Sequence, residues 1–228
     1  MNPEFVPLVA CFEVSKSYAD GDQAVVAISE LSMEARAGQM TAVVGPSGSG
    51  KTTLLHLIGG IEHADSGSII AAGADLGELS SSEQTAFRAQ NVSFVFADMN
   101  LLPVLSVYEN ISLGLALLRL SARDVDRRAM SALDLVGLAD RAHRLPATLS
   151  SGERQRVAVA RALARESTLV IADEPTAHLD HDLALQITNL FRSLAGDHGS
   201  CVLMATHDRA VAEEADQILL LEDGRRID

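Results

Sequence analysis

The stretch Gly45-Pro46-Ser47-Gly48-Ser49-Gly50-Lys51-Thr52 decides the fold, because it matches the phosphate-loop pattern G-x-x-x-x-G-K-[ST]. The apolar, β-branched run 40–44 before it predicts a buried strand, and the run 53–58 after it predicts a helix with one apolar face. Glycines let the backbone aim successive N–H groups at an anion, and the helix start adds its positive dipole end. The alternative is a glycine-rich turn without a ligand, which the ordered series of strand, loop and helix disfavours.

The residue types in this loop predict how a nucleotide is held. Lys51 is expected to reach the β- and γ-phosphates, and the Thr52 hydroxyl to hold Mg²⁺. The cofactors predicted from the loop are therefore Mg²⁺ and a nucleotide with β- and γ-phosphates. The expected nucleotide-binding residues here are Gly45, Pro46, Ser47, Gly48, Ser49, Gly50, Lys51, Thr52 and Thr53.

A second motif, Leu169 to Pro175, is an apolar run that ends in two acids. It predicts a buried strand whose tip presents carboxylates, at the edge where open α/β sheets bind ligands. Asp173 is placed to bind Mg²⁺ through water, and Glu174 to polarise the attacking water as a general base. Alone, such a run is equally typical of a strand that ends at a surface turn. Together with the phosphate loop it indicates a nucleoside triphosphatase.

Composition agrees with a globular α/β protein of 228 residues, 47% of them hydrophobic. The net charge of −13 argues against broad contact with nucleic acid or anionic lipid. The two cysteines, Cys11 and Cys201, lie in apolar runs, which fits a reducing cytosol rather than a disulfide framework. The sequence Met1 to Glu4 has no basic region, so no secretion signal is expected.

No segment is expected to cross a membrane. The best candidate, 101–120, is interrupted by Pro103, Glu109, Asn110 and Arg119. This segment predicts helices with a strongly apolar face. Most of that face is expected to pack within the domain, and the alternative is that part of it receives a partner.

Further along the chain, the patterns predict an α/β core interrupted by a helical block. The expected strands are 8–18, 25–33, 68–71, 92–96, 169–172, 201–205 and 217–221. The expected helices of the block are 107–120, 122–136 and 152–164. Asp20-Gly21-Asp22 predicts a turn, and Ser80 to Glu83 has the capping-box spacing of a helix that runs to about residue 89.

The helical block carries Leu149-Ser150-Ser151-Gly152-Glu153, which resembles the signature motif of ATP-binding cassette (ABC) ATPases. The resemblance implies that Ser150 and the Gly152 backbone N–H bind the γ-phosphate held by an opposite subunit, in a head-to-tail homodimer around two ATP molecules. Ser150 and Glu153 also have capping-box spacing, and a capped helix start is itself an anion site, so both interpretations stand together. Ser151 replaces the first glycine of the family's motif.

Other family motifs follow in order along the chain. By resemblance, Tyr18 stacks on adenine, Asp180 in Leu179-Asp180 faces the partner subunit, and His207 contacts the γ-phosphate. Tyr18 as an ordinary strand aromatic and His207 as a structural or solvated histidine are the alternatives. The pair His178 and His181 has no further ligands nearby in the sequence, so a metal site there is not expected.

Within the family, the chain is most similar to the MacB/LolD/FtsE-like group. The motifs that carry this likeness are 100–103, 106–111 and the run from Ser151. The resemblance implies a partner, an integral membrane permease subunit with an extracytoplasmic domain, and a location at the cytoplasmic face of the inner membrane. It implies export, lipoprotein extraction or mechanotransmission.

One position departs from the family pattern. The strand 92–96 is followed in the family by a glutamine that approaches Mg²⁺ and the attacking water, and here the residue is Ala97. Alanine has no donor or acceptor, so that contact is absent unless Asp98 or a water replaces it. The two interpretations are neutral drift and slow or differently coupled hydrolysis.

Together these features predict a single domain over 1–228, with an α/β, P-loop NTPase fold of the ABC ATPase type. We expect a RecA-like core (about 1–97 and 166–228), an N-terminal antiparallel β portion and an inserted helical subdomain (about 98–165). A soluble ABC ATPase with a non-membrane partner is the main alternative. A P-loop switch or kinase is the third, and the motif at Ser150 argues against it.

Overall fold

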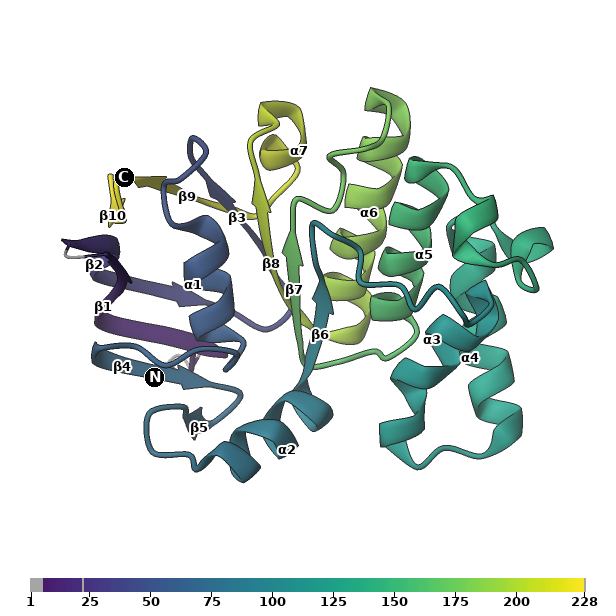
Figure 1. Cartoon of the computed structure of the whole chain (residues 1–228), viewed down its shortest axis with the longest axis horizontal. Helices are drawn as coiled ribbons and strands as arrows, with labels where there is room; N and C mark the ends of the chain where they lie inside the picture. The colour runs from purple at the N-terminus through teal and green to yellow at the C-terminus, as the bar shows by residue number, and fades with distance from the viewer. Residues whose placement is uncertain (1–5, 22, 228) are drawn as a thin grey trace, which may run out of the picture.

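The computed structural model of the chain describes residues 6–21 and 23–227, which form two β-sheets beside a block of helices (Figure 1). The expectations for Met1 to Glu4 and for Asp22 fall outside the described residues. The predicted α/β architecture, with strands alternating with helices and a helical block inserted into the core, is observed.

The N-terminal sheet is antiparallel, in the order β2-β1-β4-β5. Tyr18 on β1 pairs with Val25 on β2, and Val9 on β1 pairs with Ala71 on β4. Buried and exposed residues alternate from Leu31 to Ala35 in β2, as expected for a sheet with one face in water, whereas register shifts in β1 interrupt such alternation there. The strands are β1 (Val9–Asp20), β2 (Gln23–Ala35), β4 (Ser66–Ala71) and β5 (Ala74–Asp75).

The second sheet has the order β10-β9-β3-β8-β7-β6, and only β10 runs antiparallel to its neighbour. Its parallel strands therefore end at one common edge, where ligands bind in open α/β sheets. Every residue of β7 and β8 is buried, which explains their continuous apolar sequences. The strands are β3 (Met40–Val44), β6 (Val92–Val95), β7 (Leu169–Asp173), β8 (Cys201–Thr206), β9 (Gln217–Glu222) and β10 (Arg225–Arg226).

Helix α1 (Lys51–Ile58) contacts strands of both sheets and buries four apolar side chains between them. Helix α2 (Ser81–Asn91) starts at the predicted capping box: the Ser80 hydroxyl accepts from the Glu83 N–H, and the Glu83 carboxylate accepts from the Ser80 N–H. Two further helices connect strands of the parallel sheet: α6 (His181–His198) lies between β7 and β8 in the sequence, and α7 (Arg209–Glu213) between β8 and β9.

The helical block lies on the other side of β6 and β7 from the N-terminal sheet (Figure 1). The predicted helix 107–120 is wrong in length, because α3 ends at Leu115, a 3-10 turn follows, and Arg119 adopts a left-handed φ of 52°. The two-residue strands β5 and β10 were not predicted. The block contains α3 (Val107–Leu115), η1 (Ala116–Leu118), α4 (Ala122–Leu135), η2 (Ala139–Arg141), η3 (Pro146–Thr148) and α5 (Ser151–Leu163).

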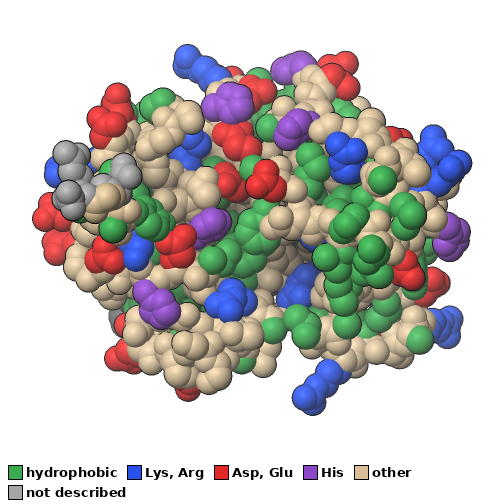
Figure 2. All heavy atoms as spheres, in the orientation of Figure 1, with side chains coloured by type: hydrophobic (Ala, Val, Ile, Leu, Met, Phe, Trp, Pro, Cys, Tyr) green, Lys and Arg blue, Asp and Glu red, His purple; other side chains and the backbone are tan. Residues whose placement is uncertain are grey.

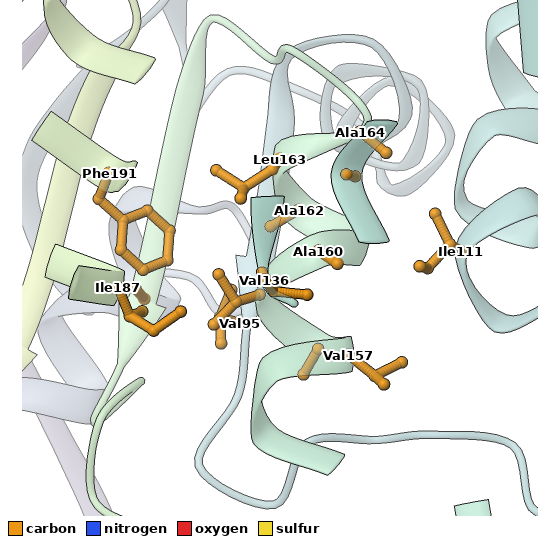
Figure 3. Close-up of a cluster of buried hydrophobic side chains, with 14 of the residues drawn as sticks. Val95, Ile111, Val136, Val157, Ala160, Ala162, Leu163, Ala164, Ile187 and Phe191 are labelled. Atoms are coloured by element: carbon orange, nitrogen blue, oxygen red, sulfur yellow. The ribbon is translucent and has the colours of Figure 1, made fainter. Parts of the chain in front are cut away.

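One continuous hydrophobic cluster joins the block to the parallel sheet. Figure 3 shows α5 side chains between Ile111 on one side and Ile187 and Phe191 on the other. Phe191 and Ile111 are fully buried. The division of the chain into core and helical subdomain stays a prediction, but this packing makes α5 the element between them.

The helical block carries several exposed apolar side chains on its surface. Figure 2 shows hydrophobic side chains gathered over this part of the molecule, on the right of the view. The exposed apolar side chains of the block include Leu102, Val104, Leu113, Leu117 and Leu145.

Within the part of the chain that the structure describes, no helix combines the length and hydropathy of a membrane span. Cys11 and Cys201 are buried free thiols.

Candidate nucleotide-binding site

The phosphate loop connects β3 to α1 at the common edge of the parallel strands. Gly50, the residue before the helix, has φ 101° and makes no side-chain cap bond. A Cβ on Gly50 would lie 2.3 Å from the Ala27 carbonyl oxygen, and one on Gly45 would lie 2.1 Å from that of Leu221. Only glycine fits at these two positions. The first N–H groups of α1 are left without a side-chain cap, as an anion-binding helix start requires.

Lys51 and Thr52 begin α1. The Lys51 side chain is buried at 8% exposure, and its ammonium group donates to the Gly45 and Pro46 carbonyl oxygens at 2.8 and 2.9 Å. These bonds hold a positive charge at the rim of the loop, where a phosphate would bind.

The Thr52 hydroxyl donates to Asp173 Oδ2 at 2.7 Å. Asp173 is the last residue of the fully buried strand β7, so its carboxylate lies at the sheet edge next to the loop. Among the described residues, no three His, Cys, Asp or Glu side chains are arranged to hold a metal ion. A hydroxyl and one carboxylate nevertheless fit Mg²⁺, which takes oxygen ligands and usually completes its shell with phosphate and water.

Glu174 and His207 form a close pair at the ends of β7 and β8. His207 Nδ1 lies 2.9 Å from both carboxylate oxygens of Glu174. Glu174 has a left-handed φ of 49°, and its N–H donates to the Ala205 carbonyl oxygen at 3.0 Å. Strained backbone of this kind is concentrated at functional sites, because the surrounding structure must hold it. The sequence placed both residues near the nucleotide but gave no sign of this contact.

These groups line one pocket of about 710 Å³ between the two sheets' adjoining ends. Of the predicted loop residues, Gly45, Pro46 and Ser49 do not line it: the first two bind the Lys51 ammonium group through their carbonyl oxygens, and Ser49 is buried. The lining residues that the sequence analysis missed are Val25, Val26 and Ala27; their only signal was an apolar strand start. The full lining is Tyr18, Val25, Val26, Ala27, Ser47, Gly48, Gly50, Lys51, Thr52, Thr53, Asp173, Glu174 and His207.

The predicted partner-facing residues lie outside this pocket. Ser150 caps α5: its hydroxyl accepts from the Glu153 N–H at 3.1 Å, and the Glu153 carboxylate accepts from the Ser150 N–H at 2.8 Å. Hydrogen bonding to Ser150 lowers the pKa of the Glu153 carboxyl; the bond from the Ser150 N–H has the larger effect and the bond with its hydroxyl the smaller. A Cβ on Gly152 would lie 3.3 Å from the His178 carbonyl oxygen, so the signature motif and the Asp180 loop touch within one chain. Asp180 itself caps α6 through the Leu183 N–H.

Ala97 is exposed and follows β6, whose Val95 pairs with Ala172 on β7. It therefore leaves the sheet beside Asp173 without a polar side-chain atom to offer. Asp98, the next residue, is exposed as well.

Comparisons with known proteins agree with this geometry. The ABC transporter family profile matches residues 28–177. The lipoprotein-releasing system ATP-binding protein LolD of Pseudomonas syringae pv. tomato is 40% identical over 221 residues, 97% of each chain. The LolD 1 protein of Rhodopirellula baltica is 42% identical, over 93% of each chain. The macrolide export ATP-binding/permease protein MacB of Rhodopirellula baltica is 38% identical over 95% of this chain but only 32% of its own length.

A solved structure completes the comparison. The dimeric ATP-binding cassette MJ0796 in a post-hydrolysis state with ADP and phosphate superposes with a TM-score of 0.92 at 32% identity, over 96% of this chain and 97% of that one. The fold, the phosphate loop and the similarity over the whole chain therefore all indicate the same family. The chain belongs to the ABC transporter family, as an ATP-binding, ATP-hydrolysing cassette of the LolD and MacB group.

Proposed function

We propose that two copies of this chain bind two Mg²⁺-ATP molecules between them and drive a separate membrane permease. The observation that carries the proposal is the sheet edge where the glycine loop, the Thr52–Asp173 contact and the Glu174–His207 pair meet in one pocket. Such an arrangement supplies positioning and charge, which are most of what phosphoryl transfer to water requires.

Each residue has a role in this proposal. The loop N–H groups and Lys51 bind the phosphates, and Tyr18 receives the adenine. Thr52 and Asp173 would hold Mg²⁺, which when bound neutralises charge on the phosphate oxygens. Glu174 orients the attacking water and accepts its proton. His207, held on Glu174 in this structure, turns to the γ-phosphate once a triphosphate enters.

We propose a dimer because the pocket of one chain lacks the two residues of the signature motif that are expected to bind the γ-phosphate. Ser150 and Gly152 are outside the pocket of their own chain, although by resemblance they contact a γ-phosphate. Two copies related head to tail would place Ser150, Gly152 and Asp180 of each against the nucleotide of the other. The dimeric state of the similar cassette MJ0796, which holds ADP and phosphate, supports this arrangement.

The membrane role is supported by the relatives. LolD proteins are named as ATP-binding proteins of a lipoprotein-releasing system, and MacB joins an ATP-binding part to a permease in one name. The exposed apolar side chains of the helical block offer a surface for such a permease. We place the chain at the cytoplasmic face of the inner membrane, bound to a permease with an extracytoplasmic domain and serving export, lipoprotein extraction or mechanotransmission.

The catalytic assignment is tested by Glu174→Gln. This variant should bind ATP normally, hydrolyse it about 100-fold more slowly, and elute as a dimer in size-exclusion chromatography with Mg²⁺-ATP. Glu166→Gln is the matched control, because Glu166 also has a left-handed φ (51°) and an ion pair, with Arg128 at 3.0 Å, outside the pocket. A Glu174→Gln variant that stays monomeric and active would refute the assignment.

The composite site is tested by complementation. Ser150→Arg should abolish hydrolysis and spare nucleotide binding, because Ser150 serves the other subunit's ATP. Mixed with Lys51→Ala, it should regain one working site per dimer and therefore at most half of the wild-type rate. Full activity of Ser150→Arg at dilute protein would indicate a monomeric enzyme instead.

The partner is tested by co-expression with a candidate membrane permease from the same genome. Recovery of the chain in the membrane fraction, with ATP hydrolysis stimulated in the reconstituted complex, supports the permease. Recovery in the soluble fraction with no stimulation favours a non-membrane partner.

A further inference from the structure

The side chain of Tyr18 is 38% exposed, yet it is held at three points. Its hydroxyl donates to Glu62 Oε2 at 2.5 Å and lies 3.5 Å from the Thr53 hydroxyl. The Lys16 ammonium group lies over the ring, 5.7 Å from its centre, within cation–π range. Burial, and then the hydrogen bond to Glu62, raise the pKa of the Tyr18 hydroxyl, so the group stays a proton donor.

Glu62 is itself fixed. Its second carboxylate oxygen, Oε1, lies 3.2 Å from His56 Nδ1, and its side chain is 28% exposed. His56 belongs to α1, the helix that begins with Lys51 at the phosphate loop. The other contact of the Tyr18 hydroxyl, Thr53, belongs to the same helix. Helix α1 therefore holds both the phosphate loop and, through Glu62, the aromatic ring.

The ring remains open on the side where a base would lie. Tyr18 lines the nucleotide pocket together with Val25, its partner across the β1–β2 pairing, and Val26. Lys16 and Glu62 are not among the residues that line the pocket. The contacts with Glu62 and Lys16 thus come from outside the space that the nucleotide would fill, whereas Thr53 itself lines that space.

We propose that Glu62 is a positioning residue that fixes the Tyr18 ring at a set distance and angle from the phosphate loop, ready to stack on a nucleobase. The inference rests on the proposed function, which gives Tyr18 the base. A ring that is already ordered loses less side-chain freedom on binding, a saving worth about threefold to tenfold in Kd.

The test compares two ligands on the full chain, Mg²⁺-ATP and Mg²⁺-tripolyphosphate, by calorimetry. Tripolyphosphate has the phosphates without the base. Tyr18→Phe keeps the ring and removes the hydroxyl, and Glu62→Ala removes the carboxylate. Each should raise the Kd for ATP about threefold to tenfold and leave the Kd for tripolyphosphate unchanged. A substitution that disturbed the fold in general would raise the Kd for both ligands.

Two further variants sharpen the result. Glu62→Gln keeps an oxygen acceptor for the Tyr18 hydroxyl and should recover most of the ATP affinity that Glu62→Ala loses. The double variant Tyr18→Phe/Glu62→Ala should be no weaker than either single variant, because both remove the same hydrogen bond. Thermal melting confirms that each variant is folded.

The contrary results are distinct. Equal losses for ATP and tripolyphosphate, no loss for ATP, or additive losses in the double variant would each overturn the role of Glu62. Wild-type protein that binds ATP no tighter than tripolyphosphate would overturn Tyr18 as the base platform and this inference with it, while leaving the phosphate site in place. Wild-type protein that binds neither ligand would refute the nucleotide site itself.

Discussion

Two loops leave the same edge of the parallel sheet and keep their shapes by different means. The phosphate loop after β3 turns at glycines, with φ 80° at Gly48 and 101° at Gly50. The loop after β6 turns at residues with side chains, with φ 62° at Met99 and 47° at Asn100. Glycine adopts such angles freely, whereas other residues need outside support. The first loop is therefore encoded locally, and the second depends on a distant group.

That distant group is Arg161 on α5. Its guanidinium donates to the Met99 and Asn100 carbonyl oxygens, both at 2.7 Å. Gly114 on α3 leaves room for it, since a Cβ there would lie 3.3 Å from Arg161 Cγ. Burial lowers the pKa of Arg161, but an arginine remains charged. Because Ser150 is the N-cap of α5, one helix connects the loop after Ala97 to the signature motif.

The largest expected effect comes from giving the first loop a side chain. In Gly50→Ala the new Cβ would meet the Ala27 carbonyl oxygen at 2.3 Å, which should cost about 3–5 kcal/mol of unfolding free energy and abolish ATP binding. In Gly48→Ala nothing lies within 4 Å, so only backbone strain of about 1 kcal/mol is expected. For each variant, urea unfolding measures the loss of unfolding free energy and titration with ATP measures the loss of binding. Equal losses would mean that strain, and not close approach, makes the glycines necessary.

The next effect concerns the support of the second loop. Arg161→Met removes two charge-assisted hydrogen bonds and should cost about 3 kcal/mol, with faster hydrogen exchange in the loop 97–106. Arg161→Lys, which keeps the charge but not the two-pronged geometry, should lose about half as much. The control is Arg209→Met, whose side chain is 93% exposed in its ion pair with Glu213 and should cost below about 1 kcal/mol. Unchanged exchange in Arg161→Met would show that the loop holds itself.

The comparison explains what could be predicted from the sequence. The strand and helix around the phosphate loop and the capping boxes at Ser80 and Ser150 are local patterns that were predicted from the sequence, although α1 begins at Lys51 and not at 53. A third capping box at Ser106 and Glu109 has the same spacing and was missed. The loop residues and the Asp173–Glu174 pair were predicted from residue patterns, and the other site residues were recognised by resemblance; the roles of all of them stay predictions.

The contacts that were not predicted join residues far apart in the chain. Tyr18 and Glu62 are 44 positions apart, Glu174 and His207 are 33, and Met99 and Arg161 are 62. Nothing in a single sequence connects such pairs, because each contact depends on how β1, α1, β7, β8 and α5 pack. The end of α3 was missed for a related reason: Arg119 takes a left-handed conformation that its residue type does not suggest.

A smaller effect is expected where the second loop begins. A lost hydrogen bond to a charged group is worth about 1.5–3 kcal/mol, so an amide at position 97 that acts mainly in the transition state would change kcat by about tenfold to 100-fold. Ala97→Gln should therefore raise kcat with little change in KM, measured with the membrane partner present. Ala97→Met adds a similar length without an amide and should bring no gain. An unchanged rate in Ala97→Gln would mean that Asp98, a water or the partner already fills the role.

The smallest effect separates the two duties of Ser150. Its hydroxyl caps α5, just as the Ser121 hydroxyl caps α4 by accepting from the Asp124 N–H at 3.2 Å. Ser150→Ala and Ser121→Ala should each cost about 1 kcal/mol of unfolding free energy, since each removes one cap. Only Ser150→Ala should also slow ATP hydrolysis, because only Ser150 is proposed to contact a nucleotide across the dimer. Unfolding curves and steady-state rates on the same preparations decide the matter. If both variants lose stability equally and neither loses rate, Ser150 is a helix cap alone, and the γ-phosphate must be held by the backbone of Gly152.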